Sequence, residues 1–287
     1  MDRLRLQIIR LLIVGAFLGA PVCGQDLGQV DLTFGLYLTD KATTMFAKFK
    51  PAVDYLEKDL AIRLHRQVKI KLKLSKTYDA AITALVQGKV DFVRFGPASY
   101  IIAKSRNKKI QLLAMELRGG KKRFNGVFVV AKDSPIQTLE QIKNKRFAFG
   151  DRNSTIGRYL AQDLLLKNGI NARALGGFSF LGRHDRVAKA VELGDYDVGS
   201  VKSSTFKKLN RSGKLRALAT FENVTKPWIA RSGLDAEVMK ALSASLQGVR
   251  EKSVLKALKV SGLQAARDED YGFVRAAMKR ALAFDKK

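Results

Sequence analysis

Cysteine and histidine are scarce in this sequence. Its 287 residues include one cysteine, Cys23, and two histidines, His65 and His184, which lie far apart. A protein zinc site gathers several cysteine, histidine or carboxylate ligands, so this composition argues against zinc. A lone cysteine has no partner for an internal disulfide, even in an oxidising compartment. We therefore expect neither a metal centre nor a disulfide-stabilised scaffold.

Motifs of the common hydrolytic and nucleotide-binding sites are also missing. The sequence contains neither the G-x-S-x-G turn that exposes a nucleophilic serine nor the G-x-x-x-x-G-K-[ST] loop that surrounds phosphates. No residues suggest a nucleophile with a neighbouring base and a group that orients it. We predict a protein that is not an enzyme and needs no cofactor. An exported phosphate-ester hydrolase is the rival hypothesis from another class.

Acidic residues are outnumbered two to one. The chain has 26 Asp and Glu against 53 Lys and Arg, a formal net charge of +27. This charge favours small anions, nucleic acid or an acidic membrane surface as partners, without choosing among them. Nucleic-acid binding needs base-stacking aromatics among the cations. Trp228 is the only tryptophan and the phenylalanines mostly fall on apolar faces, so we expect most of the cations to be solvated.

Long apolar runs are confined to the N-terminus. Residues 8–18 are mostly apolar, follow three arginines and precede small residues, which is the pattern of a secretory signal peptide. We predict cleavage after Gly24, which removes three arginines and one aspartate and lowers the net charge from +27 to +25. The mature protein is expected in the periplasm. Lipid anchoring through Cys23 is the less favoured alternative, because Val22 is a poor fit to the small residue that lipidation needs.

Strand-like and helix-like segments alternate along the rest of the chain. Residues 30–38 and 67–75 alternate apolar and polar side chains and predict strands, whereas residues 43–60 carry apolar side chains at helical spacing. This alternation predicts an α/β protein with mostly parallel sheets flanked by helices. Segments 80–100 and 185–206 share a helix, a glycine, a strand preceded by aspartate, and a turn with hydroxyl groups. They suggest two similar lobes.

A strand-to-helix junction in the middle of the chain is the first candidate site. The apolar run Phe147–Phe149 ends at Gly150. The start of the next helical pattern carries three candidates: Ser154, Thr155 and Gly157. They either cap the helix in the ordinary way or hold an anion with its free N–H groups. The second interpretation gains from the position, since ligands of open α/β sheets bind beyond the carboxyl ends of strands.

Two further junctions carry candidates. A helix that follows a buried strand begins near Ser99 and Tyr100, whose hydroxyl groups either donate to a ligand or belong to an ordinary capped helix. His184 stands at the start of another helix, either as a ligand contact or as an ordinary loop histidine. We expect His65, in a segment rich in Lys and Arg, to be solvated.

Together these blocks resemble the periplasmic substrate-binding proteins of phosphonate, phosphite and phosphate ABC transporters, the PhnD-like group. The matching segments are FKPAVDYLEKDL, ALVQGKVDFVRFGPASYIIA, GDRNSTIGRYL and the helix from His184 into LGDYDVG, in the family's order and spacing. The resemblance covers residues 30–230 and rests most on FGPASY together with NST-x-G. It implies a two-lobed type II periplasmic-binding-protein fold, with two crossing strands and lobes that close on an anion.

The resemblance also implies domains and contacts. After the predicted signal peptide, residues 1–24, lobe one would comprise residues 25–122 and 222–287, and lobe two residues 123–221. The implied ligand contacts are Ser99 and Tyr100 from lobe one, and Ser154, Thr155, Gly157, His184 and Ser204 from lobe two.

One departure from the family pattern bears on the ligand. Receptors for aminophosphonates carry an acidic residue for the amine just beyond the strand that follows the histidine helix. Here that place reads Lys202, Ser203, Ser204 and Thr205. A carboxylate would attract ammonium and repel oxyanions, so its absence favours phosphate, phosphite or a simple phosphonate. The loop at residues 39–46 also lacks the aromatic residue that the family usually carries there. One of the expected ligand contacts is therefore left unassigned, and with it the exact ligand.

We therefore predict an exported receptor that binds a small oxyanion between two lobes and delivers it to an inner-membrane ABC permease. It is expected to be a monomer that does not bind nucleic acid. The alternative within the same fold is the ligand-sensing subunit of a sensor kinase or redox system.

Overall fold

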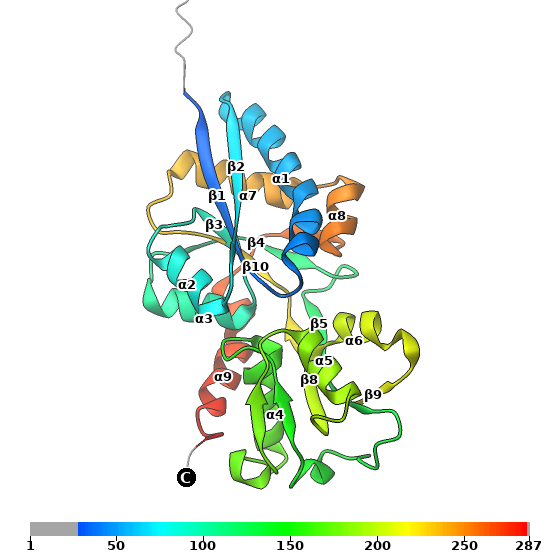
Figure 1. The fold of residues 1–287 in the computed structure, drawn as a ribbon. Coiled ribbons are helices and arrows are strands. Elements are labelled where there is room, and N and C mark those ends of the chain that lie inside the picture. The colour runs from blue at the N-terminus through cyan, green and yellow to red at the C-terminus, as the bar shows by residue number, and fades with distance from the viewer. Residues whose placement is uncertain (1–27, 286–287) are drawn as a thin grey trace, which may run out of the picture.

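The computed structural model describes residues 28–285, which form two lobes stacked end to end (Figure 1). Each lobe is a β-sheet with flanking helices, so the predicted two-lobed α/β fold is confirmed. The predicted signal peptide and Cys23 lie outside the described residues. Within residues 28–285, no helix has both the length and the apolar character that a membrane span requires.

The first lobe is built on a six-stranded sheet. Strand β1 (Val30–Tyr37) runs parallel to β2 (Val68–Ser75) on one side and to β3 (Phe92–Arg94) on the other. Because side chains alternate along a strand, Phe34 and Tyr37 enter the cores on opposite faces. Three strands complete the sheet and run antiparallel to their neighbours: β10 (Pro227–Ala230), β4 (Gln111–Leu117) and β11 (Gly262–Gln264).

Helices cover both faces of this sheet. On one face, α1 (Ala42–Leu64) buries side chains at spacings of three and four and packs against α7 (Ala236–Gly248) and α8 (Lys252–Leu258). On the other face lie α2 (Tyr78–Val86) and α3 (Pro97–Arg106). Figure 1 shows that α2 and α3 begin at the end of the first lobe that faces the second lobe.

The second lobe is built on a five-stranded sheet. Parallel strands β7 (Phe178–Phe180), β6 (Phe147–Phe149) and β8 (Val198–Lys202) lie on one side. Antiparallel strands β5 (Arg123–Ala131) and β9 (Leu215–Val224) complete it. Both sheets are therefore mixed rather than mostly parallel. Strand β5 enters the second lobe from the first and is antiparallel to β8, and β10 enters the first lobe from the second and is antiparallel to β3.

The second lobe's helices are short. Around its sheet lie α4 (Leu160–Lys167), α5 (His184–Glu192) and α6 (Ser203–Leu209). Its two sheet faces carry separate apolar cores, one of which is dominated by phenylalanine rings.

Two chain segments join the lobes. Residues 118–122 connect β4 to β5, and residues 225–226 connect β9 to β10. The amide of Thr225 donates to the carbonyl of Lys122 at 2.9 Å, so the two crossings are tied to each other. Lys226, in the second crossing, is thereby fixed at the boundary between the lobes.

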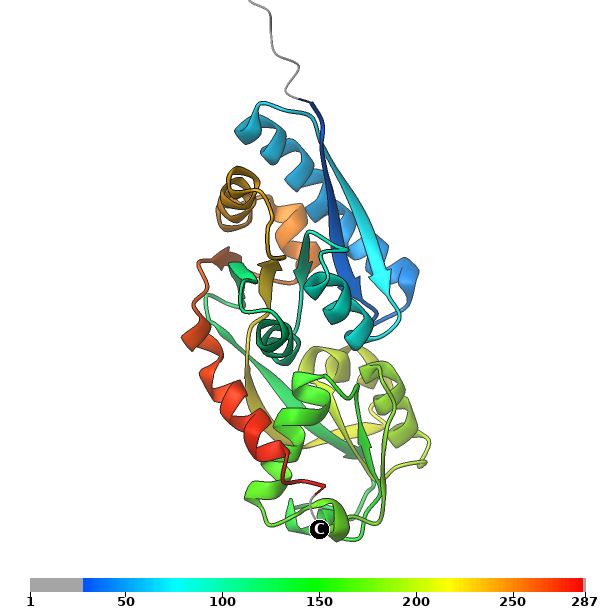
Figure 2. The same ribbon diagram turned by 90° about the vertical axis from the view of Figure 1, so that its left-hand side faces the viewer.

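The C-terminal helix α9 (Gly272–Ala281) runs alongside both lobes (Figure 2). Tyr271, just before it, is buried in a first-lobe core, and Phe284, after it, is buried in the second lobe. The ring of Phe284 lies 5.6 Å from that of Phe149. Assignment of residues 222–287 to lobe one alone is thus too simple, because the phenylalanine core of the second lobe takes up the end of the chain.

Candidate functional site

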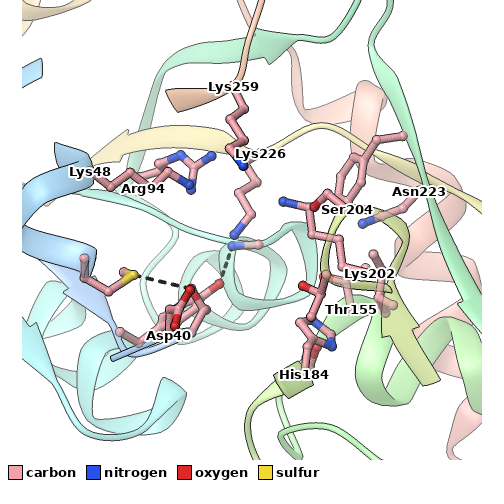
Figure 3. A pocket seen from close by; sticks show the side chains of 18 of the residues that line it. Asp40, Lys48, Arg94, Thr155, His184, Lys202, Ser204, Asn223, Lys226 and Lys259 are labelled. Atoms are coloured by element: carbon pink, nitrogen blue, oxygen red, sulfur yellow. Dashed lines mark hydrogen bonds between the residues drawn. The ribbon is translucent and has the colours of Figure 1, made fainter. Parts of the chain in front are cut away.

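A cavity of about 450 Å³ lies between the lobes. Its first-lobe lining includes Tyr37 at the end of β1 and Gly96 after β3. Its second-lobe lining includes Ser154 after β6 and Lys202 at the end of β8. The cavity thus lies at the carboxyl ends of strands from both sheets, where α/β folds place their ligands. Figure 3 shows side chains from both lobes converging there.

Two tyrosines form one wall of the cavity. The rings of Tyr37 and Tyr78 stack with centroids 3.6 Å apart, and both residues are buried. The Tyr37 hydroxyl accepts a 2.6 Å hydrogen bond from the amide of Gly96. A Cβ at position 96 would meet that hydroxyl at 3.0 Å, so glycine allows the close approach. Burial raises the pKa of Tyr37 to about 12, so the phenol keeps a proton to donate.

Neither tyrosine is among the candidates that the sequence alone suggests. Tyr37 ends an alternating strand and Tyr78 begins the helix after the next strand, so both stand at the carboxyl ends of neighbouring parallel strands. This positional signal is present in the sequence, but it becomes specific only when the strand pairing is known. The two rings supply aromatic contact beside the loop at residues 39–46.

Ser154 and Thr155 bring hydroxyl groups to the cavity from the second lobe. Ser154 Oγ accepts a 2.9 Å hydrogen bond from the amide of Gly157 and so caps its own helix. Thr155 Oγ1 accepts a 2.9 Å hydrogen bond from the amide of Ala98 at the start of α3, in the other lobe. A hydroxyl that accepts a hydrogen bond still has its own proton to donate. Capping and anion binding are therefore compatible at both residues.

The helix after Ser154 starts as a wide turn. Thr155–Tyr159 form a single π-helical turn, and α4 continues from it. Such turns are frequent at functional sites. Gly157 lies in this turn against Gly150, where an added Cβ would come within 2.7 Å of the Gly150 Cα. Gly157 therefore permits close packing; its amide is engaged by Ser154, and it does not line the cavity.

Ser99 and Tyr100 do not line the cavity. Both are buried in the first lobe, and the Tyr100 hydroxyl donates to the carboxylate of Asp268 at 2.7 Å. The residues of this junction that line the cavity are Gly96 and Pro97. Tyr100 lies nearly one turn further along α3, on the side that faces the core, so the expected contact from Tyr100 is corrected. Ser99 lies beside Tyr37, and its contact stays a prediction.

His184 is the first residue of α5 and lines the cavity. Its Nδ1 atom is buried and has no hydrogen-bond partner among the described residues. Burial, together with the charges of Lys202 and Lys226, lowers the imidazole pKa to about 4. The ring is therefore neutral near pH 7, with one nitrogen able to donate and the other to accept. A ligand in the cavity would give Nδ1 a partner.

The rest of the cavity is strongly cationic. Besides Lys208 of α6, four lysines from different segments line it: Lys48 of α1, Lys202 of β8, Lys226 of the second crossing and Lys259 after α8. In Figure 3, Lys48, Lys226 and Lys259 lie on the side of Arg94, across the cavity from Thr155 and His184. Among the described lining residues Asp40 is the single carboxylate, and it pairs with Lys208 at 3.1 Å. The exposed side chain of Ser204 also lines the cavity.

Arg94 is held by a buried ion pair with Glu116. Its Nη2 donates to Glu116 Oε2 at 2.9 Å, and its Nε donates to the other carboxylate oxygen. Arg118 lies 3.7 Å from the same carboxylate. Burial opposes ionisation, but the charges of Arg94 and Arg118 hold the pKa of Glu116 below its usual value. Glu116 is thus an anion engaged by two guanidinium groups.

The cavity lysines have lowered pKa values. Burial, reinforced by the charge of Arg94, lowers the pKa of Lys48 to about 7. Burial and neighbouring cations also place the pKa values of Lys202 and Lys226 well below the usual lysine value. Burial and like charges both disfavour the ammonium form. An anion in the cavity would favour that form again.

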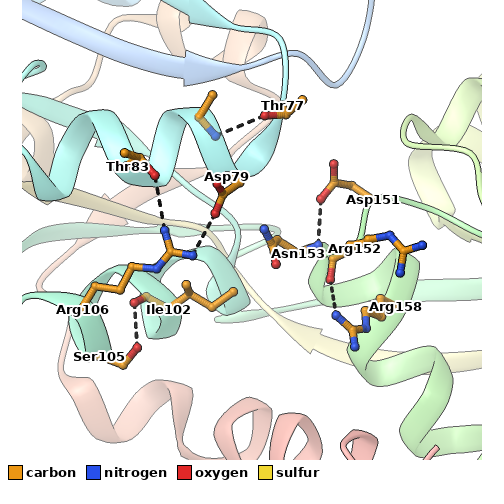
Figure 4. Close-up of polar contacts among 11 residues, drawn as sticks. Thr77, Asp79, Thr83, Ile102, Ser105, Arg106, Asp151, Arg152, Asn153 and Arg158 are labelled. Atoms are coloured by element: carbon orange, nitrogen blue, oxygen red, sulfur yellow. Dashed lines mark hydrogen bonds and ion pairs between the residues drawn. The ribbon is translucent and has the colours of Figure 1, made fainter. Parts of the chain in front are cut away.

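Another polar group faces the boundary between the lobes outside the cavity (Figure 4). Arg106 of α3 pairs with Asp79 of α2 at 2.8 Å. Across the boundary, Asp151 accepts a 2.7 Å hydrogen bond from the amide of Asn153. Burial raises the pKa of Asp151, but this carboxyl does not line the cavity.

Comparisons with known sequences agree with this geometry. The family model for the periplasmic substrate-binding protein of the phosphonate ABC transporter matches residues 34–271. The chain is 28% identical to a probable ABC transporter phosphite-binding protein, PhnD1, of Prochlorococcus marinus, over 65% of this chain and 67% of that protein. It is 25% identical to the phosphate-import protein PhnD of Mycolicibacterium smegmatis, over 58% of this chain and only 54% of that protein.

Solved structures share the fold. PhnD1 of Prochlorococcus marinus in complex with methylphosphonate has a TM-score of 0.74 at 23% identity, covering 87% of this chain and 97% of that one. A binding-protein component of an ABC phosphonate transporter from Pseudomonas aeruginosa has a TM-score of 0.77 at 22% identity, covering 90% and 88%. Because the family match spans most of its length, the chain belongs to the family of periplasmic substrate-binding proteins of phosphonate ABC transporters.

Proposed function

We propose that the protein is an exported receptor that binds a small tetrahedral oxyanion between its lobes and delivers it to an inner-membrane ABC permease. The ligands we expect are phosphate, phosphite or a phosphonate. The observation that carries the proposal is the convergence of hydroxyl donors on one cavity: Tyr37 and Tyr78 from the first lobe, Ser154 and Thr155 from the second. Each hydrogen bond to a charged oxygen contributes roughly 1.5–3 kcal/mol. His184 adds a neutral donor from the side.

Contacts across the cavity couple binding to closure of the lobes. Thr155 Oγ1 accepts from the amide of Ala98, and Lys208 pairs with Asp40, in both cases between the lobes. A ligand bonded to both lobes stabilises the closed arrangement over an open one. The permease would then recognise the closed shape, as in other hinged binding proteins.

We infer that the receptor does not catalyse a reaction. Its relatives are substrate-binding transport proteins. The cavity holds hydroxyl groups, but the neutral His184 has no carboxylate bonded to Nδ1 to orient it as a base. Within residues 28–285, no group of three or more His, Cys, Asp or Glu side chains could hold a metal ion. Turnover of a phosphate monoester by the homogeneous protein would contradict this.

Export is the second part of the proposal. The relatives' family is periplasmic, and the N-terminal pattern predicts cleavage after Gly24. Mass spectrometry of the periplasmic fraction should find a chain that begins at Gln25. An intact Met1 on soluble protein would refute the predicted cleavage. Light scattering of the same sample should give the mass of a monomer.

Calorimetry tests the ligand class directly. The mature protein should bind at least one of phosphate, phosphite and methylphosphonate with 1:1 stoichiometry. A thermal shift should accompany binding, because a ligand at 100 times its dissociation constant adds about 2.7 kcal/mol to the free energy of unfolding. Folded protein that binds none of the three would refute the proposed function.

A further inference from the structure

The cavity has two chemically different parts. We call the part lined by Tyr37, Tyr78, Ser154 and Thr155 the hydroxyl end. We call the part lined by Lys48, Lys202, Lys226 and Lys259 the ammonium end. In Figure 3 the ammonium groups of Lys48 and Lys259 lie with Arg94 on the opposite side from Thr155. Lys226 connects the two ends, since its Nζ lies 5.9 Å from the ring centre of Tyr37.

The lysines of the ammonium end lack partners. Their Nζ atoms make no hydrogen bond or ion pair with any of residues 28–285. Three of them lie over aromatic rings instead, as Lys202 Nζ does at 5.5 Å from the ring centre of Phe124. Elsewhere at the same boundary, Lys122 pairs with Asp270 at 2.7 Å. Lys259 is exposed, but Lys48, Lys202 and Lys226 are partly buried, so these three differ from the lysines of an ordinary charged surface, which meet carboxylate or water.

The nearby carboxylates are already engaged. Asp40 pairs with Lys208, and Glu116 pairs with Arg94. Neither is free to neutralise the four lysines. Positive charges brought together in a partly buried cavity repel one another unless a negative charge joins them. The described chain offers these lysines no free carboxylate, so an anion bound in the cavity would be their partner and would favour their charged form.

One tetrahedral oxyanion does not account for both ends. The hydroxyl end offers four hydroxyl groups, and His184 adds a ring nitrogen, which suffices for the three oxygens of a phosphonate. The lysines come from α1, β8, the second crossing and the segment after α8, so both lobes and the hinge contribute to the ammonium end. The cavity therefore has more donors than the oxygens of one oxyanion can accept. The surplus donors point to a second acceptor group on the ligand.

We propose that the ligand carries two anionic groups, a tetrahedral oxyanion at the hydroxyl end and a carboxylate or second phosphoryl group at the ammonium end. The proposal rests on the proposed function, because it concerns the same cavity, and it narrows the substrate class to phosphonates or phosphates that bear a second acid group. The lowered pKa values of Lys48, Lys202 and Lys226 agree with this, since a second anion would draw protons onto these side chains. Binding should therefore take up protons from the buffer near pH 8.

The test compares four phosphonates that share a two-carbon spacer and differ in the group at its end. Propylphosphonate ends in a methyl group, 2-aminoethylphosphonate in an ammonium, 3-phosphonopropionate in a carboxylate and ethane-1,2-diphosphonate in a second phosphoryl group. We expect one or both of the doubly acidic ligands to bind at least tenfold more tightly than propylphosphonate, about 1.4 kcal/mol. Which of the two binds more tightly distinguishes a carboxylate from a phosphoryl group. The aminophosphonate should bind no more tightly than propylphosphonate.

A pair of double variants assigns the effect to the ammonium end. Lys202→Gln with Lys226→Gln should reduce the preference for the doubly acidic ligand over propylphosphonate to less than threefold, a ratio of two affinities measured on the same folded variant. The matched control is Lys71→Gln with Lys73→Gln, which removes the same charge from exposed positions on the edge strand β2. The control should retain the full preference.

The outcomes separate this inference from the proposed function. If propylphosphonate and methylphosphonate bind but neither doubly acidic ligand binds more tightly, the second anionic group is refuted and the receptor function stands. If the cavity variant weakens all four ligands by the same factor, the lysines attract anions in general, and the inference is again refuted. If none of the phosphonates, phosphate or phosphite binds the folded wild-type protein, both proposals are wrong.

Discussion

The hydroxyl end and the ammonium end of the cavity bind by different physical means. At the hydroxyl end, Tyr37, Ser154 and Thr155 each accept a backbone N–H, which fixes where their own protons point. At the ammonium end, flexible lysine side chains have no partner among the described residues. The first end is ordered before a ligand arrives, whereas the second is a set of charges that a ligand would order.

The difference separates recognition of shape from recognition of charge. Donors that are already oriented lose little entropy on binding, so they favour a ligand with oxygens in the matching tetrahedral geometry. Ammonium groups are point charges on long stems and accept more varied geometry. Their effect depends on salt and pH, because salt screens charges and deprotonation removes them. The hydroxyl end should therefore resist changes of salt and pH that weaken the ammonium end.

The largest effect is expected from removing the second-lobe hydroxyl groups. Ser154→Ala with Thr155→Ala should weaken methylphosphonate binding by two orders of magnitude or more, because each lost bond to a charged oxygen contributes roughly 1.5–3 kcal/mol. Calorimetry measures the affinity, and circular dichroism checks that the variant is folded. Unchanged affinity in the folded variant would remove both residues from the site.

The control for this variant separates capping from binding. Thr77 Oγ1 accepts a 3.1 Å hydrogen bond from the amide of Ala80 and caps α2, but Thr77 does not line the cavity. Thr77→Ala should lower the free energy of unfolding by about 0.5–2 kcal/mol, as the loss of a helix cap does. It should leave the affinity for methylphosphonate unchanged.

The next effect concerns the first-lobe half of the hydroxyl end. Tyr37→Phe removes a proton donor and leaves the buried amide of Gly96 without its acceptor. The loss of one bond to a charged oxygen, roughly 1.5–3 kcal/mol, should weaken binding ten- to a hundredfold. Tyr55→Phe is the matched control, because the Tyr55 hydroxyl donates to the carbonyl of Ser245 outside the cavity. Equal affinities for the two variants would contradict a ligand contact at Tyr37.

Local sequence signals locate the second-lobe part of the hydroxyl end. The run Phe147–Phe149, then Gly150 and Ser154, specifies a strand, a turn and a helix start within a few residues, and the structure follows it. The two similar segments of the sequence also fold alike, as α2-β3-α3 and α5-β8-α6. Gly96 in one and Ser204 in the other line the cavity. Short-range rules suffice here because capping and turns are decided locally.

The ammonium end depends on long-range packing; of its four lysines, only Lys202 was singled out from the sequence, through the family resemblance. Lys48 and Lys50 lie two residues apart on α1 and look alike in the sequence. Lys50 is exposed and pairs with Asp54 at 2.7 Å, whereas Lys48 lines the cavity. Only the packing of α1 above the second lobe separates them. Lys226 likewise lies in the site because the two chain crossings meet there. No local sequence pattern predicts that meeting.

Above pH 7, the pH dependence of stability should report mainly the ammonium end. The pKa of Lys48 falls from 10.5 to about 7 in the folded protein. Between these values the unfolded chain binds a proton that the folded chain lacks, so stability should rise as pH increases from 7 to 9. The slope from one such group is at most about 1.4 kcal/mol per pH unit. Tyr37 adds no slope there, because its pKa is raised to about 12.

Urea unfolding of the ligand-free protein at pH 7, 8 and 9 measures this slope. Lys48 faces Arg94, Arg118 and Lys259, with Glu116 as the opposing charge. Lys48→Gln should reduce the slope, while Lys202 and Lys226 maintain part of it in the same direction. Lys50→Gln, on the exposed side of the same helix, is the control and should leave the slope unchanged. A wild-type stability that falls from pH 7 to 9 would contradict the lowered lysine pKa values.

The smallest effect is expected at the ion pair between the lobes. Lys208 lies 3.1 Å from Asp40, and both side chains are partly exposed, so the pair contributes only about 0.2–1 kcal/mol. Lys208→Gln removes the pair and leaves an unpaired carboxylate facing the bound anion. Both consequences weaken binding, by at most about fivefold.

Asp40→Asn should change the affinity less than Lys208→Gln does, because its two consequences oppose each other. It removes the same contact between the lobes, which weakens binding, but it also removes the single carboxylate from the described cavity lining, which favours an anion. Asp54→Asn, which breaks an exposed pair within α1, is the control and should have no effect. Calorimetry with 3-phosphonopropionate and 2-aminoethylphosphonate measures both variants. The contrary outcome is that Asp40→Asn weakens binding of the aminophosphonate more than binding of the carboxylate-bearing ligand. In that case Asp40 binds a ligand's amine, and the cavity selects a positive group rather than the negative group that its lysines favour.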